Sequence, residues 1–156
     1  MPTKYLLSNK FKRIGWILLI IGIAIGILLY TDLLESELLK VKVLSIYHEG
    51  FMSSNIGFFK IVENGILDEI VAILIIVGGL LVGFSKEKNE DEYIYQLRKE
   101  SLIWAIIVNY VILLLAIVFV YDMTFFNVLI FNMFTPLIFF IIRFNFLKYK
   151  SAQHEE

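Results

Sequence analysis

The chain contains no cysteine and little proline. Its 156 residues include two prolines and no cysteine. Without cysteine, disulfide bonds, thiolate catalysis and cysteine-ligated metal sites are excluded. Because proline is rare, long helices can form all of their backbone hydrogen bonds internally, as a lipid environment requires.

Charged residues are also missing from four long apolar stretches. These stretches are Ile14–Tyr30, Ile70–Phe84, Ser101–Tyr121 and Met123–Ile142. A helix of about 20 residues crosses the ~30 Å hydrocarbon core of a bilayer. Apolar residues make up 59% of the chain, above the ~45–50% of soluble domains. Because the apolar runs are continuous and do not alternate, a β-barrel is excluded.

The pattern predicts an all-α membrane protein, a bundle of four transmembrane helices forming one domain over residues 1–156. The expected parts are spans at 14–31, 66–85, 101–121 and 124–143, an outer loop at 32–65 and a cytoplasmic connector at 86–100. The second span is short, and a re-entrant segment is the alternative for it. If it crosses, Asp68 and Glu69 occupy its first turn, where the helix dipole favours them.

Basic residues divide unequally between the two sides of these spans. Eleven of the fourteen Lys and Arg residues precede the first span, lie between the second and third, or follow the fourth. By the positive-inside rule, both termini are expected in the cytoplasm. The formal net charge of −1 and the scattered basic residues indicate no nucleic-acid partner. The apolar spans make the lipid bilayer the expected partner, and a second copy of the chain or another membrane protein is the further candidate.

The first apolar stretch follows Lys10, Lys12 and Arg13, as the apolar part of a secretory signal would. Its 17 residues are long for such a segment, and no pair of small residues follows Tyr30 for cleavage. We interpret it as a retained membrane anchor.

The two polar segments have patterns of their own. In the outer loop, Val41–Tyr47 and Ile56–Val62 predict a short β-hairpin around a turn at His48–Asn55. Such a hairpin is marginal alone, so it must lean on the helices, the membrane surface or a neighbouring subunit. Asp32–Lys40 is expected to form a short amphipathic helix or to continue the first span.

In the connector, Asn89-Glu90-Asp91-Glu92 has the spacing of a helix N-cap followed by a glutamate. The helix that starts there should run without a break into the third span. Its charged end is interpreted as solvated, and a docking surface for a cytoplasmic partner is the alternative.

Five residues form a candidate polar cluster inside the membrane: Asn109, Asn132, Thr135, Pro136 and Arg143. Pro136 has no amide hydrogen, so the Asn132 carbonyl loses its helical partner. We expect the Asn109 amide to bond to this carbonyl or to the Thr135 hydroxyl and to hold the helices together. A polar lining of a pore or pocket is the alternative. Arg143 is expected to snorkel to the headgroups, or else to pair inside the bundle.

Four glycines at a spacing of four are candidate helix-packing positions: Gly22, Gly26, Gly79 and Gly83. We expect them to pack the first span against the second, with a homo-oligomeric contact as the alternative.

Catalysis finds little support. His48-Glu49 lacks the second histidine of a zinc-protease helix, His154 is expected across the membrane, and Ser53 and Ser54 have only His48 nearby as a base. No histidine and no carboxylate pair lies within a span, so no metal or cofactor is expected.

Several strings resemble a known group. They are Gly83–Lys88, Leu97–Ala105, Val108–Tyr110 and Ile141–Phe146. They are similar to stretches of small four-span membrane proteins of bacteria with A/T-rich genomes. The resemblance implies a bacterial inner-membrane location and no particular chemistry.

Three functions follow as hypotheses. The first is a non-enzymatic integral membrane protein that binds a partner or serves as an accessory subunit. The alternative is a homo-oligomeric pore-forming or membrane-perturbing protein, and the second alternative is a membrane enzyme.

Overall fold

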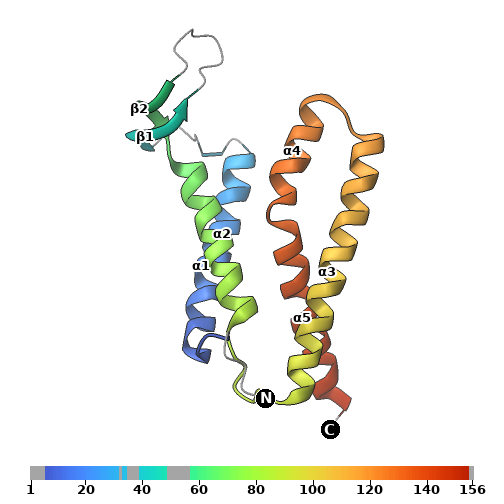
Figure 1. Ribbon diagram of the computed structural model, residues 1–156. Coiled ribbons are helices and arrows are strands. Elements are labelled where there is room, and N and C mark those ends of the chain that lie inside the picture. Colours follow the sequence, from blue (N-terminus) through green and yellow to red (C-terminus); the bar gives the residue numbers. More distant parts are fainter. Residues whose placement is uncertain (1–5, 32, 35–38, 49–56, 155–156) are drawn as a thin grey trace. The chain divides into compact units, whose positions relative to one another are not determined.

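The computed structural model describes residues 6–31, 33–34, 39–48 and 57–154, and this part of the chain is mostly helical (Figure 1). Its elements in chain order are α1 (Asn9–Tyr30), β1 (Lys40–His48), β2 (Gly57–Gly65), α2 (Leu67–Phe84), α3 (Glu92–Phe119), α4 (Asp122–Asn132) and α5 (Thr135–His154). The expected β-hairpin is confirmed. Residues 49–55 of its predicted turn, and most of the segment predicted to be helical before it, lie outside the described residues.

Within the described ranges, three helices are long and apolar enough to cross a membrane. They are Lys10–Tyr30, Leu67–Phe84 and Glu92–Phe119. The apolar helices thus indicate a membrane-embedded protein. A fourth candidate arises if α4 and α5 together make one span.

The prediction of one uninterrupted helix over 124–143 is wrong. α4 and α5 are bent by 49°, and Met133 and Phe134 between them close tight turns onto Ile130 and Phe131. The cause is local, because Pro136 cannot donate a hydrogen bond to the Asn132 carbonyl. A proline so close to the start of α5 costs that helix nothing, since first-turn amides have no helical partner.

The described chain divides into two compact units, Met1–Ile20 with Ile75–Glu156, and Ile21–Leu74. In the first unit α3 and α5 lie side by side (Figure 1). The side chains of Ala105, Phe140 and Phe144 there are at most 1% exposed. This apolar core holds the ends of the helices that carry the polar site described below.

Close approach of α1 to α2 in the first unit depends on two glycines. A Cβ atom at Gly78 would lie 2.5 Å from the Leu19 backbone nitrogen, and one at Gly15 would lie 2.9 Å from the Val82 nitrogen. Only hydrogen fits at either position, so these helices are packed backbone to backbone.

The predicted packing role of Gly79 and Gly83 on the first span is wrong. A Cβ atom at Gly79 would meet Leu137 of α5, and one at Gly83 would meet Phe140 of the same helix. Gly78 and Gly79 are adjacent in the sequence and therefore about 100° apart on the helix, so Gly78 meets α1 while Gly79 meets α5. Gly22 and Gly26 lie in the second unit, where Gly22 is buried and Gly26 is half-buried.

The hairpin of the second unit is antiparallel, with a register from Lys40 opposite Gly65 to His48 opposite Gly57. Its base is fixed to α2. The Ile66 amide donates to the Leu39 carbonyl at 3.1 Å, and the Asn64 amide donates to Glu69 at 2.8 Å. Asp68 and Glu69 occupy the first turn of α2, as expected.

The N-cap of helix α3 lies two residues after the predicted cap, Asn89. Asp91, and not Asn89, is the N-cap, and its carboxylate accepts from the Ile94 amide at 2.8 Å. Glu90 is engaged by Arg98, as described below, which leaves Asp91 as the acceptor at the helix start. From there α3 continues without a break to Phe119, as expected.

Candidate functional site

The polar site is built where the start of α1 meets the segment that follows α2. Leu7 forms a parallel bridge with Ser85. The Leu7 amide donates to the Phe84 carbonyl and the Lys86 amide donates to the Leu7 carbonyl, each at 2.9 Å. The Asn9 side chain adds a hydrogen bond to the Lys86 carbonyl at 2.7 Å. These bonds place the N-terminal segment directly on the connector.

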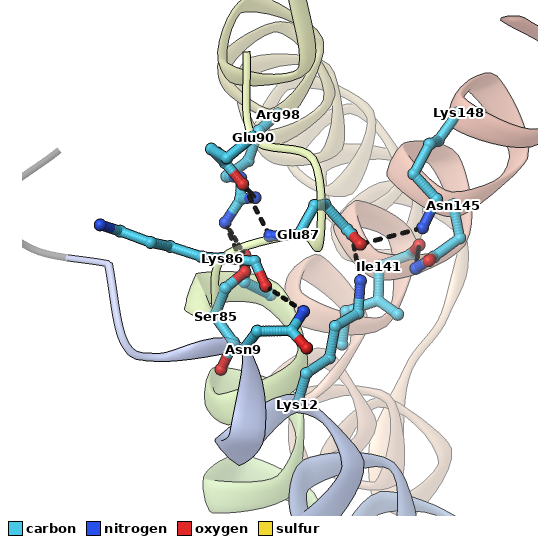
Figure 2. A network of polar contacts seen from close by, with 11 residues as sticks. Asn9, Lys12, Ser85, Lys86, Glu87, Glu90, Arg98, Ile141, Asn145 and Lys148 are labelled. Atoms are coloured by element: carbon cyan, nitrogen blue, oxygen red, sulfur yellow. Dashed lines mark hydrogen bonds and ion pairs between the residues drawn. The ribbon is translucent and has the colours of Figure 1, made fainter. Parts of the chain in front are cut away.

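Arg98 of α3 is the central cation of this site (Figure 2). Its Nη2 atom contacts the two carboxylate oxygens of Glu90 at 3.1 and 2.9 Å, and its Nη1 atom donates to the carbonyls of Ser85 at 2.9 Å and Gly83 at 3.3 Å. The last carbonyls of a helix have no partner within the helix and carry its negative dipole end. Arg98 therefore caps the C-terminus of α2 while it pairs with Glu90, and it is only 5% exposed.

Glu87 is the second centre of the site. Its carboxylate forms ion pairs with Lys12 of α1 and, at 3.2 Å, with Lys148 of α5 (Figure 2). Burial raises the pKa of Glu87, and the hydrogen bonds and charges of Lys12 and Lys148 lower it by more, so its pKa lies below the ordinary value. One carboxylate in the connector thus fastens α1 to α5.

The two centres are joined into one network. The Glu87 amide donates to the Glu90 carboxylate at 2.7 Å, and the ring of Phe144 lies 5.0 Å from the Arg98 guanidinium and 5.7 Å from the Lys12 ammonium. Aromatic faces attract cations, so Phe144 supports both. Five charged residues make up this ion-pair network: Lys12, Glu87, Glu90, Arg98 and Lys148.

The serine hydroxyls beside the network add no hydrogen bond. Ser85 and Ser101 are fully buried, and the Oγ atoms of both have no hydrogen-bond partner in the described part of the chain. The five charged residues pair with one another, although the Arg98 Nε atom also has no hydrogen-bond partner in the described part of the chain. The role that this arrangement suits best is structural, because its ion pairs and hydrogen bonds hold the ends of α1, α2, α3 and α5 together.

Asn109 and Asn132 are brought together, as the sequence indicated, but through a different group. Each side-chain amide donates to the side-chain oxygen of the other, at 3.4 and 3.2 Å. Contrary to expectation, the Asn109 amide does not bond to the Asn132 backbone carbonyl or to the Thr135 hydroxyl, because it donates to the Asn132 side-chain oxygen instead. The Thr135 hydroxyl donates to the Phe131 carbonyl. Two amides facing each other satisfy a donor and an acceptor on both sides, which a single carbonyl does not.

The remaining predicted cluster residues lie elsewhere. Thr135 and Pro136 are at the bend between α4 and α5, and the Arg143 guanidinium stacks on the Trp104 ring at 4.5 Å. Trp104 belongs to α3, so Arg143 adds an aromatic contact between α3 and α5, and not a polar pair inside the membrane. The headgroup contact expected for Arg143 stays a prediction.

No group of three or more His, Cys, Asp or Glu side chains that could hold a metal ion is found among the residues described. His48 ends strand β1, and Ser53 and Ser54 lie outside the described residues. Comparison with protein-family models, with curated proteins and with solved structures found no match.

Proposed function

We propose that the chain is a bacterial inner-membrane protein that crosses the bilayer four times, has both termini in the cytoplasm, and acts as a non-enzymatic accessory subunit that binds a partner membrane protein. The ion-pair network supports the topology. Lys12, Glu87 and Lys148 come from the N-terminal helix, the connector and the C-terminal helix and are in contact. An odd number of crossings would separate Lys12 from Lys148 by the membrane.

The observation that carries the accessory role is the lack of packing around α4. This helix has 11 residues, about 16 Å at 1.5 Å each, and none of them is buried. Beyond Asn109, α3 buries only Ala116. A short helix that is bent away from its successor and buries none of its residues needs a neighbour to fix its orientation, and a transmembrane helix of a partner would supply it.

The Asn109–Asn132 pair favours this function over a pore. Asn109 is 2% exposed, and its amide is satisfied by Asn132. A residue that lines an aqueous path has its amide turned toward water or solute. The pair is better suited to hold α3 and α4 together, which bonds of this kind do at about 0.6–2 kcal/mol each.

The absence of native cysteine permits a direct test of the topology. Single cysteines replace the exposed residues Lys42, Lys88 and Gln153. With a membrane-impermeant maleimide, we expect labelling of Lys42→Cys in intact cells and labelling of the other two only after the membrane is opened. Labelling of Lys88→Cys or Gln153→Cys in intact cells would overturn the four-span topology.

Photocrosslinking tests the accessory role. A benzophenone amino acid replaces Phe126 of α4, and a control replaces Ile142 of α5; both native side chains are at least 60% exposed. We expect one discrete heterologous adduct from position 126 and not from position 142, and co-purification of the identified protein that a Phe126→Lys variant loses. Adducts only at multiples of the chain mass, or ion flux through liposomes that hold the purified protein, would instead support the homo-oligomeric pore.

A further inference from the structure

One face of the β1–β2 hairpin carries an apolar patch next to an ion pair. Leu44 lies opposite Ile61, and Lys42 lies opposite Glu63. Residues two apart on a strand share a face, so Ile46 lies on this face beyond Leu44. Leu44, Ile46 and Ile61 are 64%, 68% and 73% exposed. The Lys42 ammonium lies 3.8 Å from Glu63 at the end nearer to α2.

The other face is less exposed in the middle of the strands. Val43, Ser45, Lys60 and Val62 lie there and are half-buried. Nearer the turn, this face carries Tyr47 and Phe58, which are 51% and 70% exposed. In the middle of the hairpin, the side chains of the Leu44–Ile46–Ile61 patch are therefore the more exposed ones.

The hairpin is tied to the start of a candidate membrane span. Ile66 alone separates the end of β2 from the first residue of α2, which begins the apolar stretch Leu67–Phe84. The Leu39–Ile66 backbone bond and the Asn64–Glu69 side-chain bond fix the base of the hairpin to the first turn of α2. If α2 crosses the bilayer, the base lies at headgroup level.

The edges of the hairpin are poorly suited to adding a strand from a second copy. In β2, Phe59 has a φ of 55°, a conformation that side chains larger than hydrogen rarely adopt and that breaks the regular sequence of edge donors and acceptors. In β1, the Tyr47 carbonyl already accepts from the Ser45 hydroxyl at 2.7 Å. Strand addition requires regular, available edges, so what covers the patch must contact side chains.

We propose that the Leu44–Ile46–Ile61 face of this hairpin binds the surface of the bilayer in which the chain is embedded. The three side chains enter the boundary between headgroups and acyl chains, and the Lys42–Glu63 pair lies among the headgroups. The strand edges stay in the hydrated headgroup layer, because open sheet edges are not tolerated in hydrocarbon. The binding follows the logic of an amphipathic element lying in the interface. This inference rests on the membrane placement of the proposed function.

Spin labelling of the full-length protein in lipid nanodiscs tests the proposal. Single cysteines are introduced at Ile61 and, on the opposite strand, at Leu44, with Lys42→Cys as the control on the same face. Ile107→Cys marks the outer side of α3, where the native residue is 58% exposed. For each spin label, the rate of collision with oxygen, which concentrates in lipid, is compared with the rate of collision with a water-soluble nickel chelate. Thermal unfolding of each variant verifies that it is folded.

We expect labels at positions 61 and 44 to have an oxygen-to-nickel collision ratio several-fold above that of position 42, and close to that of position 107. Equal ratios at 61, 44 and 42, with a high ratio at 107, would overturn the hairpin proposal and leave the membrane placement standing. Low collision with both reagents and dipolar broadening at 61 would show that a second copy covers the face, and would also overturn it. A low ratio at 107 would overturn the membrane placement itself.

Discussion

Arg98 and Glu90 form a shielded ion pair in which one guanidinium nitrogen lies 2.9 and 3.1 Å from the two carboxylate oxygens. The side chains are 6% and 14% exposed. The pair connects the second turn of α3 to the connector just before that helix, and Arg98 extends it to the end of α2. Removing either partner leaves the other charge without compensation in a poorly hydrated place.

Glu90→Gln should therefore be strongly destabilising. Breaking a buried ion pair costs about 3–5 kcal/mol, and the low end applies to a site at the edge of water. The measurement is the free energy of unfolding in mixed detergent micelles. Glu100→Gln on the exposed side of α3 is the control and should change stability by less than about 0.5 kcal/mol. Equal effects of the two substitutions would show that the Arg98 pair is not structural.

Arg98→Lys should also destabilise, although the charge is kept. In the parent protein, Nη2 of Arg98 contacts Glu90 while Nη1 contacts the Gly83 and Ser85 carbonyls. A lysine has one ammonium nitrogen, which cannot occupy both positions. We expect a loss of about 1–3 kcal/mol, the cost of leaving a buried polar group unsatisfied. Lys99→Arg, the next residue and exposed, is the control. A lysine variant as stable as the parent would mean that the carbonyl contacts contribute nothing.

Stability should fall in acid because of Glu87. Its folded pKa lies below the ordinary value of 4.5, so its contribution is present above that pH and is lost as pH falls through the folded pKa. The melting temperature measured between pH 7 and pH 3 should decrease below about pH 4.5. The Glu87→Gln variant should have a lower melting temperature than the parent at pH 7, and its melting temperature should change less as the pH falls to 3. Parallel curves for the two proteins would assign the acid sensitivity to other carboxylates.

Asn109→Leu should destabilise the chain by about 0.6–2 kcal/mol, because the Asn132 amide then loses its partner. Asn132→Leu should have a similar effect for the same reason. The double variant leaves no unpaired amide, so it should cost less than the sum of the single substitutions in a double-mutant cycle. Strict additivity of the two effects would exclude a direct Asn109–Asn132 interaction.

Gly78→Ala should be far more damaging than Gly79→Ala. The new methyl group at position 78 would lie 2.5 Å from a backbone nitrogen of α1, whereas at position 79 its nearest neighbour is the Leu137 Cδ2 atom. A leucine end can rotate away and backbone cannot, so Gly78→Ala must separate α1 from α2. Thermal unfolding compares the two variants. A larger loss for Gly79→Ala would contradict this packing.

The helices and the hairpin could be read from the sequence because their causes are local. Uncharged apolar stretches determine α1, α2 and α3, and β-branched and aromatic residues determine the two strands. The bend before α5 also has a local cause in Pro136, although the sequence pattern predicted only that this proline frees the Asn132 carbonyl. The approach of Asn109 to Asn132 followed from the antiparallel order of neighbouring helices.

The ion-pair network was decided only by the tertiary structure. In the sequence, Lys12 and Arg98 resemble the basic residues that set membrane topology, and Glu90 resembles a residue at the start of a helix. Because each residue already has such an explanation, nothing in the sequence indicates that they contact one another. The five charges lie up to 136 residues apart, from Lys12 to Lys148, and no periodicity relates them. The same holds for Gly78 and Gly79, since the helix that each one faces depends on the rotation of α2 between α1 and α5. Hydropathy determined which segments are apolar helices, and the folded contacts alone determined which of their ends are clamped together.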